Sequence, residues 1–273
     1  MFGFKEYLRR NIVSIGGTKS IKKQVNLEWW SQKVNVGDYL AKVIFEYMMD
    51  RNGIKNDVKM KKTIHLMTVG SLIGMYDFDA VVWGSGVHCM ENVRRIYKQS
   101  KYRKYDVRLV RGPITQEFLK SAGYSVPELY GDPAVIMPDI YTPRCEKEYN
   151  TSVILHLSQK GLLETDQDVH FIDVATNDYQ AFIDQIVKSK KVISSSLHGI
   201  ILAESYGVPA VFLSQGMSGE LMKFYDWYFS TGRRTIKVAE SFDEAIQMTP
   251  MELPDLCILR DNVYKTFPID LWK

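Results

Sequence analysis

"KVISSSLHGIILAESYGVPAVFLS" spans residues 191–214 and changes its hydrophobic pattern twice. A β-rich run ends in three serines, an apolar run typical of a helix follows up to Gly207, and a second β-rich run begins after it. Two strands joined by a helix form a βαβ unit, in which the strands are parallel and the crossover is right-handed. The stretch therefore predicts an α/β fold.

The same alternation continues on both sides of this stretch. We expect strands at 79–86 ("DAVVWGSG"), 106–113 ("DVRLVRGP") and 151–158 ("TSVILHLS") and helices at 114–123 and near 179–187. Pro113 suits a first helical position, and Gly123 suits the residue that ends a helix. Repeated strand–helix alternation of this kind is typical of parallel sheets covered by helices.

Residues 137–150 ("MPDIYTPRCEKEYN") interrupt this rhythm with two prolines and a group of charges. We interpret this segment as an interdomain linker, because boundaries fall in polar, proline-containing stretches. The chain then divides into two α/β domains, an N-terminal one at 1–145 and a C-terminal one at 150–273. A last helix, near 252–266, could pack back on the first domain.

Composition excludes several classes of protein. The chain has 273 residues, of which 45% are hydrophobic and 25% charged, so it should bury a core. Apolar runs fall short of the roughly 20 residues that a membrane span needs. A net charge of +3 gives no support for nucleic-acid binding. We expect a cytoplasmic protein without a signal peptide.

The first 23 residues carry six basic side chains and one acidic side chain, Glu6. Basic side chains near an anionic lipid surface give weak, salt-sensitive attachment. The segment could therefore touch the inner face of a membrane, or it could be a solvated basic end whose apolar residues pack on the protein itself.

Ser194, Ser195 and Ser196 lie where a strand runs into a helix, and His198 falls in the first helical turn. In open α/β sheets ligands bind beyond the carboxyl ends of the strands, and helix N-termini favour anions. The four residues therefore suggest an anion site beside a side chain that can exchange a proton. An ordinary serine cap followed by an unrelated histidine is the alternative.

Two further polar groups precede helices. "NVGD" (35–38) brings Gly37 and Asp38 to a helix start, where Asp38 could face a ligand or only cap the helix. Arg111 follows a strand, and its guanidinium could bind a carboxylate or phosphate or form a surface ion pair.

Five motifs occur in the order found in the polysaccharide pyruvyl transferase family, which this chain resembles from about residue 30 to about residue 235. They are "NVGD" (35–38), "VWGSG" (82–86), "VRGPIT" (110–115), "YGDPAV" (130–135) and "SSSLHGIILAESYGVPAV" (194–211). The later segment "KFYDWYFSTGR" (223–233) is also similar to exopolysaccharide members.

This resemblance implies two Rossmann-like domains in a GT-B-like glycosyltransferase architecture, with the active site in the cleft between the domains. It implies that phosphoenolpyruvate is the donor, a co-substrate rather than a cofactor, and that no cofactor or metal is needed. The acceptor is a sugar of an exopolysaccharide, a capsular polysaccharide or a lipid-linked oligosaccharide. The product is a pyruvate ketal, and phosphate leaves.

Carried onto this sequence, the family pattern gives His198 and Asp38 as catalytic residues. Either could be the acid or the base, and Asp38 could instead position the acceptor. The donor-binding residues are Arg111, Ser194, Ser195, Ser196, Gly199 and Lys223. The acceptor or cleft residues are Asn35, Gly37, Gly84, Ser85, Asp132 and Glu204. The donor side falls in the C-terminal domain and the acceptor side in the N-terminal domain.

Two other functions compete with this prediction. A GT-B nucleotide-sugar glycosyltransferase would share the architecture, and fold alone does not exclude it. A non-catalytic scaffold of polysaccharide assembly is the second alternative. Arg111 and His198 distinguish the pyruvyl transferase from the glycosyltransferase, and the presence of Asp38, Arg111 and His198 together argues against the scaffold.

Overall fold

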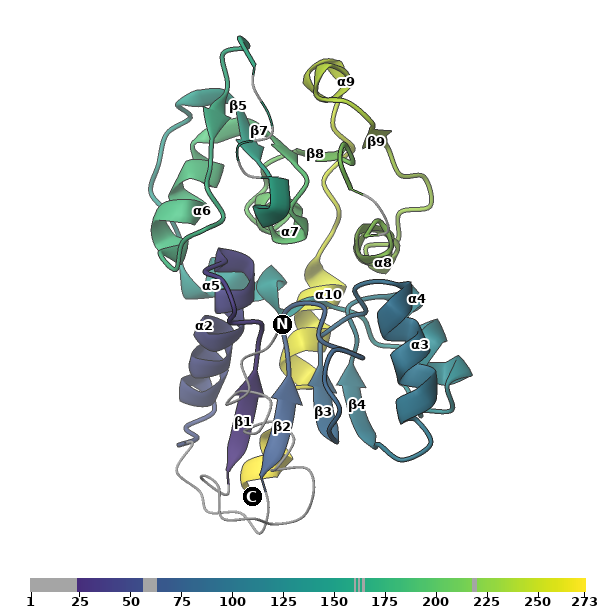
Figure 1. Cartoon of the computed structure of the whole chain (residues 1–273). Helices are drawn as coiled ribbons and strands as arrows, with labels where there is room; N and C mark the ends of the chain where they lie inside the picture. Colours follow the sequence, from purple (N-terminus) through teal and green to yellow (C-terminus); the bar gives the residue numbers. More distant parts are fainter. Residues whose placement is uncertain (1–23, 56–62, 160, 162, 164, 218–219) are drawn as a thin grey trace.

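A computed structural model describes residues 24–55, 63–159, 161, 163, 165–217 and 220–273. The predicted membrane contact of residues 1–23 lies outside them. The described residues form two parallel sheets, one above the other in Figure 1. The predicted α/β class with parallel sheets is confirmed.

The first sheet has the strand order β1-β2-β3-β4, and every neighbouring pair is parallel. Its strands are β1 (Val25–Glu28), β2 (Ile64–Met67), β3 (Ala80–Trp83) and β4 (Tyr105–Leu109). Its helices are α2 (Val36–Arg51), α3 (Met90–Gln99) and α4 (Pro113–Ser121). All four residues of β3 are buried, as expected for a parallel strand with both faces covered.

The second sheet has the order β6-β5-β7-β8-β9 and is also parallel throughout. Its strands are β5 (Tyr149–Ile154), β6 (His170–Phe171), β7 (Ser189–Ser194), β8 (Ala210–Leu213) and β9 (Val238–Ala239). Its helices are α6 (Tyr179–Val187), α7 (Leu197–Ser205), α8 (Met222–Ser230) and α9 (Phe242–Gln247).

This strand order is that of a doubly wound sheet. From β5 the chain adds β6 on one side, then crosses back and adds β7, β8 and β9 on the other side. The reversal lies between β5 and β7. Ligands of such sheets bind at the carboxyl ends of the two strands that flank the reversal. The topology therefore directs attention to the residues that follow Ile154 and Ser194.

The predicted elements appear close to their expected bounds. The βαβ unit of residues 191–214 forms β7, α7 and β8, and Pro113 is the first residue of α4. Residues 137–150 are less irregular than predicted, because Met137–Ile140 form the short helix α5 and Tyr149 already belongs to β5. Four residues are too few for a helical period to show in the sequence. The domain boundary drawn through this segment stays a prediction.

The C-terminal residues pack against the first sheet although they follow the second along the chain, as Figure 1 shows for α10 (Cys257–Lys265). Trp83 Nε1 donates a hydrogen bond to the Val263 carbonyl at 3.1 Å. The 3-10 helix η3 (Ile269–Trp272) ends the chain nearby. The predicted return of the last helix to the first half is confirmed.

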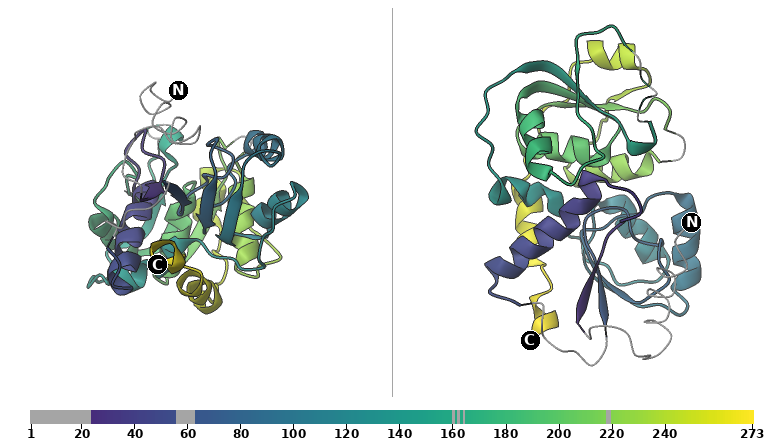
Figure 2. Two further views of the ribbon diagram at one scale, coloured as in Figure 1. Left: turned by 90° about the horizontal axis from the view of Figure 1, so that it is seen from below. Right: turned by 60° about the vertical axis from the view of Figure 1, so that its left-hand side comes forward.

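Between the sheets lie the 3-10 helix η1 (Pro133–Ile136) and α5, and one apolar core runs through both halves at this level. Helix α2 also reaches the second half, as the right view of Figure 2 shows. Its first amide, Val36 N, donates to the Val174 carbonyl at 2.9 Å. The N-terminus of α2 is thereby fixed beside the carboxyl ends of the second sheet. None of the helices in the described ranges is long and apolar enough to cross a membrane.

Candidate active site

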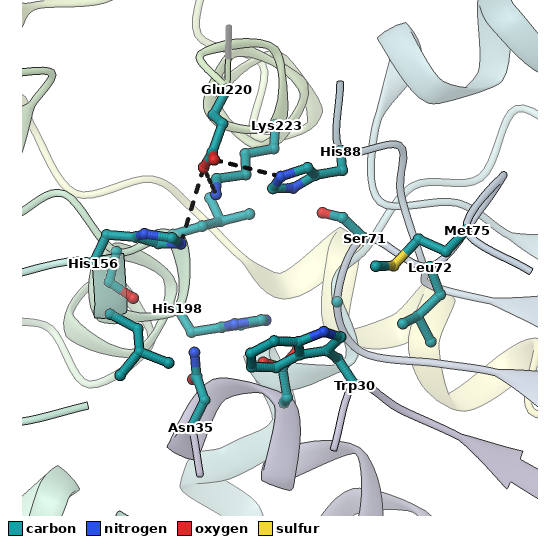
Figure 3. A pocket seen from close by; sticks show the side chains of 15 residues that line it. Trp30, Asn35, Ser71, Leu72, Met75, His88, His156, His198, Glu220 and Lys223 are labelled. Carbon is teal, nitrogen blue, oxygen red and sulfur yellow. Dashed lines mark hydrogen bonds and ion pairs between the residues drawn. The ribbon is translucent and has the colours of Figure 1, made fainter. Parts of the chain in front are cut away.

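A cavity of about 250 Å³ lies where the carboxyl ends of strands from both sheets meet. Residues following β1, β2 and β3 and the start of α2 line one side, and residues following β5 and β7 and the start of α8 line the other. Figure 3 shows the lining side chains. The cavity includes the strand-order reversal of the second sheet, so it is the leading candidate for an active site.

The start of α2 places Asp38 in this cavity. Asn35, not Asp38, caps the helix, since its side-chain oxygen accepts a hydrogen bond from Gly37 N at 2.9 Å. The alternative in which Asp38 is only a cap is therefore wrong. The Asp38 carboxylate accepts no hydrogen bond from the described residues, and both Asn35 and Asp38 line the cavity.

Burial dominates the electrostatics of Asp38 and raises the pKa of its carboxyl from 3.8 to about 6. The nearby His198, Lys223 and His88 oppose this rise, because positive charge favours the ionised carboxylate. A carboxyl with a pKa near 6 can take up and release a proton close to neutral pH.

His198 reaches the same cavity from the first turn of α7. Its Nε2 lies 3.7 Å from Oδ2 of the buried Asp132, whose Oδ1 accepts from Ala134 N at 3.0 Å. Asp132 thus caps η1 with one oxygen and turns the other toward the histidine. A carboxylate behind a histidine can orient the ring and stabilise its charged form.

Gly37 allows the close approach of α2 to this histidine. A Cβ atom at Gly37 would overlap the His198 ring, with Nδ1 the nearest atom. Gly37 therefore has a packing role that brings Asp38 and His198, which are distant in the sequence, to one cavity.

The three serines differ in position. Ser196 lines the cavity. Ser194 Oγ donates to the Ile154 carbonyl at 2.9 Å and accepts from Ser196 N at 3.0 Å. Ser195 Oγ accepts from His156 N at 2.8 Å and also contacts Gln159 Oε1. The hydroxyls of Ser194 and Ser195 thus join the ends of β5 and β7 behind the cavity wall.

Three other predicted residues also lie behind this wall. Gly84 has a φ of 87°, and a Cβ atom there would overlap Pro133. Ser85 Oγ donates to the Gly70 carbonyl at 2.9 Å and so shapes the loop that follows β2. Gly199 packs closely against the Ser194 hydroxyl.

Arg111 is fully buried and does not line the cavity. Its Nε donates to Asp226 Oδ2 at 3.1 Å and its Nη2 to the Val87 carbonyl at 2.9 Å. Its Nη1 donates to Ser71 Oγ at 2.7 Å, and Ser71 does line the cavity. The guanidinium therefore lies one residue behind the cavity surface.

Glu204 lies on α7 outside the cavity lining. It accepts a hydrogen bond from Trp227 Nε1 at 2.9 Å and pairs with Arg233 at 2.8 Å. These contacts attach α7 to α8 and to the residues that follow α8.

Lys223, a predicted donor residue, is buried at the start of α8 and lines the cavity. Burial lowers the pKa of its ammonium group. Its Nζ lies 2.8 Å from Oε2 of Glu220, a residue that sequence reasoning missed. Hydrogen bonds from His88 and Lys223 hold the pKa of the Glu220 carboxyl well below its usual range.

Other lining residues that sequence reasoning missed include Trp30, His88 and His156. Burial, with Lys223 nearby, lowers the pKa of His156 to about 4. A signal existed for two of them: His156 follows a strand that flanks the reversal, and His88 follows the predicted strand 79–86. The rule that pointed to the serines applies equally to these positions.

Within the described ranges, the structure places no three His, Cys, Asp or Glu residues in an arrangement that could hold a metal ion. The described lining residues instead combine titratable side chains, the buried Lys223 and the indole of Trp30.

The profile of the polysaccharide pyruvyl transferase family matches residues 59–216. The chain belongs to this family. The family match contains His88, His156 and His198, whereas Asp38, Glu220 and Lys223 lie outside the matched residues.

Two relatives extend the comparison. An uncharacterized protein of Acanthamoeba polyphaga mimivirus is 26% identical over 219 residues, which cover 76% of this chain and 74% of the relative. Succinoglycan biosynthesis protein ExoV of Rhizobium meliloti (strain 1021) is 26% identical over 226 residues. That match covers 75% of this chain but only 64% of ExoV, so the chain spans less than two thirds of that relative.

Among solved structures, a functionally uncharacterized protein of Klebsiella pneumoniae resembles this pyruvyl transferase family member with a TM-score of 0.54. The likeness covers 81% of this chain and 94% of that one. At 15% sequence identity it concerns the fold alone.

Proposed function

We propose that this chain transfers the enolpyruvyl-derived group of phosphoenolpyruvate to a sugar, forms a pyruvate ketal and releases phosphate. The acceptor is a sugar of a polysaccharide or of a lipid-linked oligosaccharide in exopolysaccharide synthesis. Family membership supports the reaction class. The observation that carries the proposal is the placement of Asp38, His198 and Lys223 around one cavity from three separate segments.

We further propose that the two halves form a GT-B-like pair of Rossmann-like domains and that the cavity is part of the cleft between them. The C-terminal side, from residue 150 onward, takes the donor, because Ser196, His198 and Lys223 supply hydrogen-bond donors there. The N-terminal side, up to residue 145, takes the acceptor. Trp30 supports this assignment, since an aromatic face suits the apolar face of a sugar ring.

The reaction needs one acid and one base. A proton adds to the methylene carbon of phosphoenolpyruvate and makes it a methyl group, while one sugar hydroxyl attacks the neighbouring carbon and loses its proton. The bond from that carbon to the phosphate oxygen then breaks, and a second hydroxyl attacks the same carbon. The proton of the second hydroxyl leaves with the phosphate, so atoms and charges balance.

We assign the proton donor for carbon to His198 and the hydroxyl base to Asp38. The raised pKa of Asp38, about 6, lets it accept a proton from a sugar hydroxyl near neutral pH. Oδ2 of Asp132 lies 3.7 Å from Nε2 of His198, behind the ring. Asn35 borders the acceptor side, and Gly37 positions the histidine.

Arg111 stays a predicted donor-site residue. Arg111 would act on the donor through Ser71, because its guanidinium donates a hydrogen bond to the Ser71 hydroxyl and Ser71 lines the cavity. Ser194, Ser195 and Gly199 support the donor side in the same indirect way.

We propose that the enzyme works without a cofactor in the cytoplasm, where phosphoenolpyruvate is made, and visits the inner membrane face when its acceptor is lipid-linked. Purified protein incubated with phosphoenolpyruvate and candidate lipid-linked glycans tests the reaction. Mass spectrometry should find the mass gain of a ketal together with released phosphate. Release of a nucleoside diphosphate from a sugar nucleotide, without ketal formation, would instead identify a glycosyltransferase.

A further inference from the structure

Two histidines and one lysine converge on one carboxylate inside the cavity (Figure 3). Lys223 Nζ lies 2.8 Å from Glu220 Oε2, His88 Nε2 lies 3.5 Å from Oε1, and His156 Nε2 lies 3.9 Å from Oε2. His88 follows a strand of the first sheet, whereas the other three residues belong to the second half. The residues of an oxyanion site are therefore present, and a side chain of the protein itself occupies it.

The charge of the cavity makes this arrangement unfavourable for an anionic ligand. Among the described residues that line the cavity, two carboxylates, Asp38 and Glu220, face one ammonium group, that of Lys223. A ligand that carries a carboxylate and a phosphate would meet like charge at close range, and like charges repel strongly where water is excluded. Withdrawal of one carboxylate would therefore favour the binding of such a ligand.

Glu220 is the carboxylate that can withdraw. Its side chain is 29% exposed, whereas that of Lys223 is 6% exposed. Rotation about its own bonds would carry the Glu220 carboxylate toward solvent and leave the side chains of His88, His156 and Lys223 where they are. Asp38, by contrast, belongs to the first turn of α2, whose N-terminus is fixed by contacts with the second half.

We propose that His88, His156 and Lys223 form an oxyanion subsite, and that Glu220 is a built-in competitor that an incoming carboxylate or phosphate displaces. The identity of the natural ligand rests on the proposed function, whereas the subsite itself does not. Displacement also breaks the contact between Glu220 and His88, which joins the two halves of the chain across the cavity. The incoming anion replaces this link, because it contacts His88 from the first half and His156 and Lys223 from the second.

The magnitude follows from competition within one molecule. If Glu220 occupies the subsite about nine-tenths of the time, only about a tenth of the molecules can bind, and the apparent Kd is raised about tenfold. Glu220→Gln keeps the shape of the side chain and removes its charge. We expect this variant to bind oxyanions about tenfold more tightly, which corresponds to about 1.4 kcal/mol. Glu220→Ala should change affinity in the same direction.

Calorimetric titration without acceptor measures the Kd of wild type and of each variant for an oxyanion. Inorganic phosphate, pyruvate and phosphoenolpyruvate are the three separate probes. A gain for pyruvate assigns the subsite to the carboxylate end of the donor, and a gain for phosphate alone assigns it to the phosphate end. Lys223→Met should weaken every probe that Glu220→Gln strengthens. Glu128→Gln is the matched control, because it removes the same charge from an exposed pair with Lys120.

Equal affinities in wild type and Glu220→Gln, or no measurable binding to either, would overturn the proposal. An equal increase in anion affinity in Glu128→Gln would also overturn it, since the change in the net charge of the protein would then explain the increase in Glu220→Gln. The two proposals fail separately. Absence of ketal with a persisting gain in phosphate affinity refutes the reaction and leaves the subsite. Ketal formation with unchanged anion affinities refutes the subsite and leaves the reaction.

Discussion

Replacement of Asp38 by asparagine should make this protein more stable near neutral pH while it removes activity. The burial of Asp38 gives the sign of this change in stability. Burial raises the pKa of Asp38 from 3.8 to about 6, so the folded chain binds a proton more tightly than the unfolded chain does. Ionisation of Asp38 therefore favours unfolding, and the stability that protonation supplies is lost as the pH rises from 3.8 to about 6.

The size of the effect follows from the same two values. The difference between 3.8 and about 6 corresponds to about 3 kcal/mol at about pH 7.5, since each pH unit corresponds to about 1.4 kcal/mol. Asp38 also lies in the first turn of α2, where a negative charge gains about 0.3–1 kcal/mol. We therefore expect Asp38→Asn to raise the free energy of unfolding by about 2 kcal/mol near neutral pH. At about pH 4.5 only about 1 kcal/mol or less of this gain should remain.

Urea unfolding of wild type and Asp38→Asn at these two pH values measures the increase in the free energy of unfolding near neutral pH and its decrease at the lower pH. Glu46→Gln is the matched control, because it removes one exposed charge from the same helix and should change stability by less than about 0.5 kcal/mol. Turnover of Asp38→Asn should fall on the order of 100-fold if Asp38 is the base. A variant that is no more stable than wild type at neutral pH, or whose stability gain is the same at both pH values, would refute the reasoning.

Four other predictions concern the cavity and the N-terminus. His198→Ala should reduce ketal formation on the order of 100-fold, whereas circular dichroism should show an unchanged fold; near wild-type turnover would exclude an acid role. Gly37→Ala should displace the His198 ring and reduce kcat, but it should reduce kcat much less in a chain that already carries His198→Ala, where only the clash with the Cβ atom at position 198 remains; a double-mutant cycle detects this non-additivity. Arg111→Lys should lower the free energy of unfolding by about 3–5 kcal/mol, since lysine cannot make the three contacts of the buried guanidinium, and urea unfolding that matches wild type would contradict this. Sedimentation with anionic vesicles at low salt should bring down the full chain but not a chain without residues 1–20, and equal sedimentation of both would exclude attachment by this segment.

The parts of the fold that the sequence predicts are those with a local signal. The βαβ unit at 191–214 is visible because its apolar residues change from one period to another between turn residues. The rule that ligands bind beyond strand ends places Ser196 and His198 at a ligand site from the sequence alone, and both line the cavity. Applied to every strand, the same rule also selects His88 and His156.

Other features depend on contacts that no local pattern reveals. Asn35 and Asp38 are both acceptable caps by residue type, and only the geometry of α2 shows that Asn35 takes this role. Glu220 precedes α8 with no motif of its own, and it meets His88 only because the two halves pack together. Arg111 lies between a strand and a helix as predicted, yet the burial that separates it from the cavity follows from the docking of α8 against α4.

Asp38 and Asp226 show how the protein treats one residue type in two ways. Asp226 is fully buried, and it accepts hydrogen bonds from Arg111 Nε at 3.1 Å, from Thr115 N at 3.0 Å and from Thr115 Oγ1 at 2.6 Å. Its charge is thus offset by three donors, as expected of a structural carboxylate. Asp38 has no such donors among the described residues, and its pKa is raised accordingly. A carboxylate that weakens the fold at neutral pH, beside a histidine and a buried lysine, is best explained by what it does to a ligand, because an asparagine at the same position would serve the fold better.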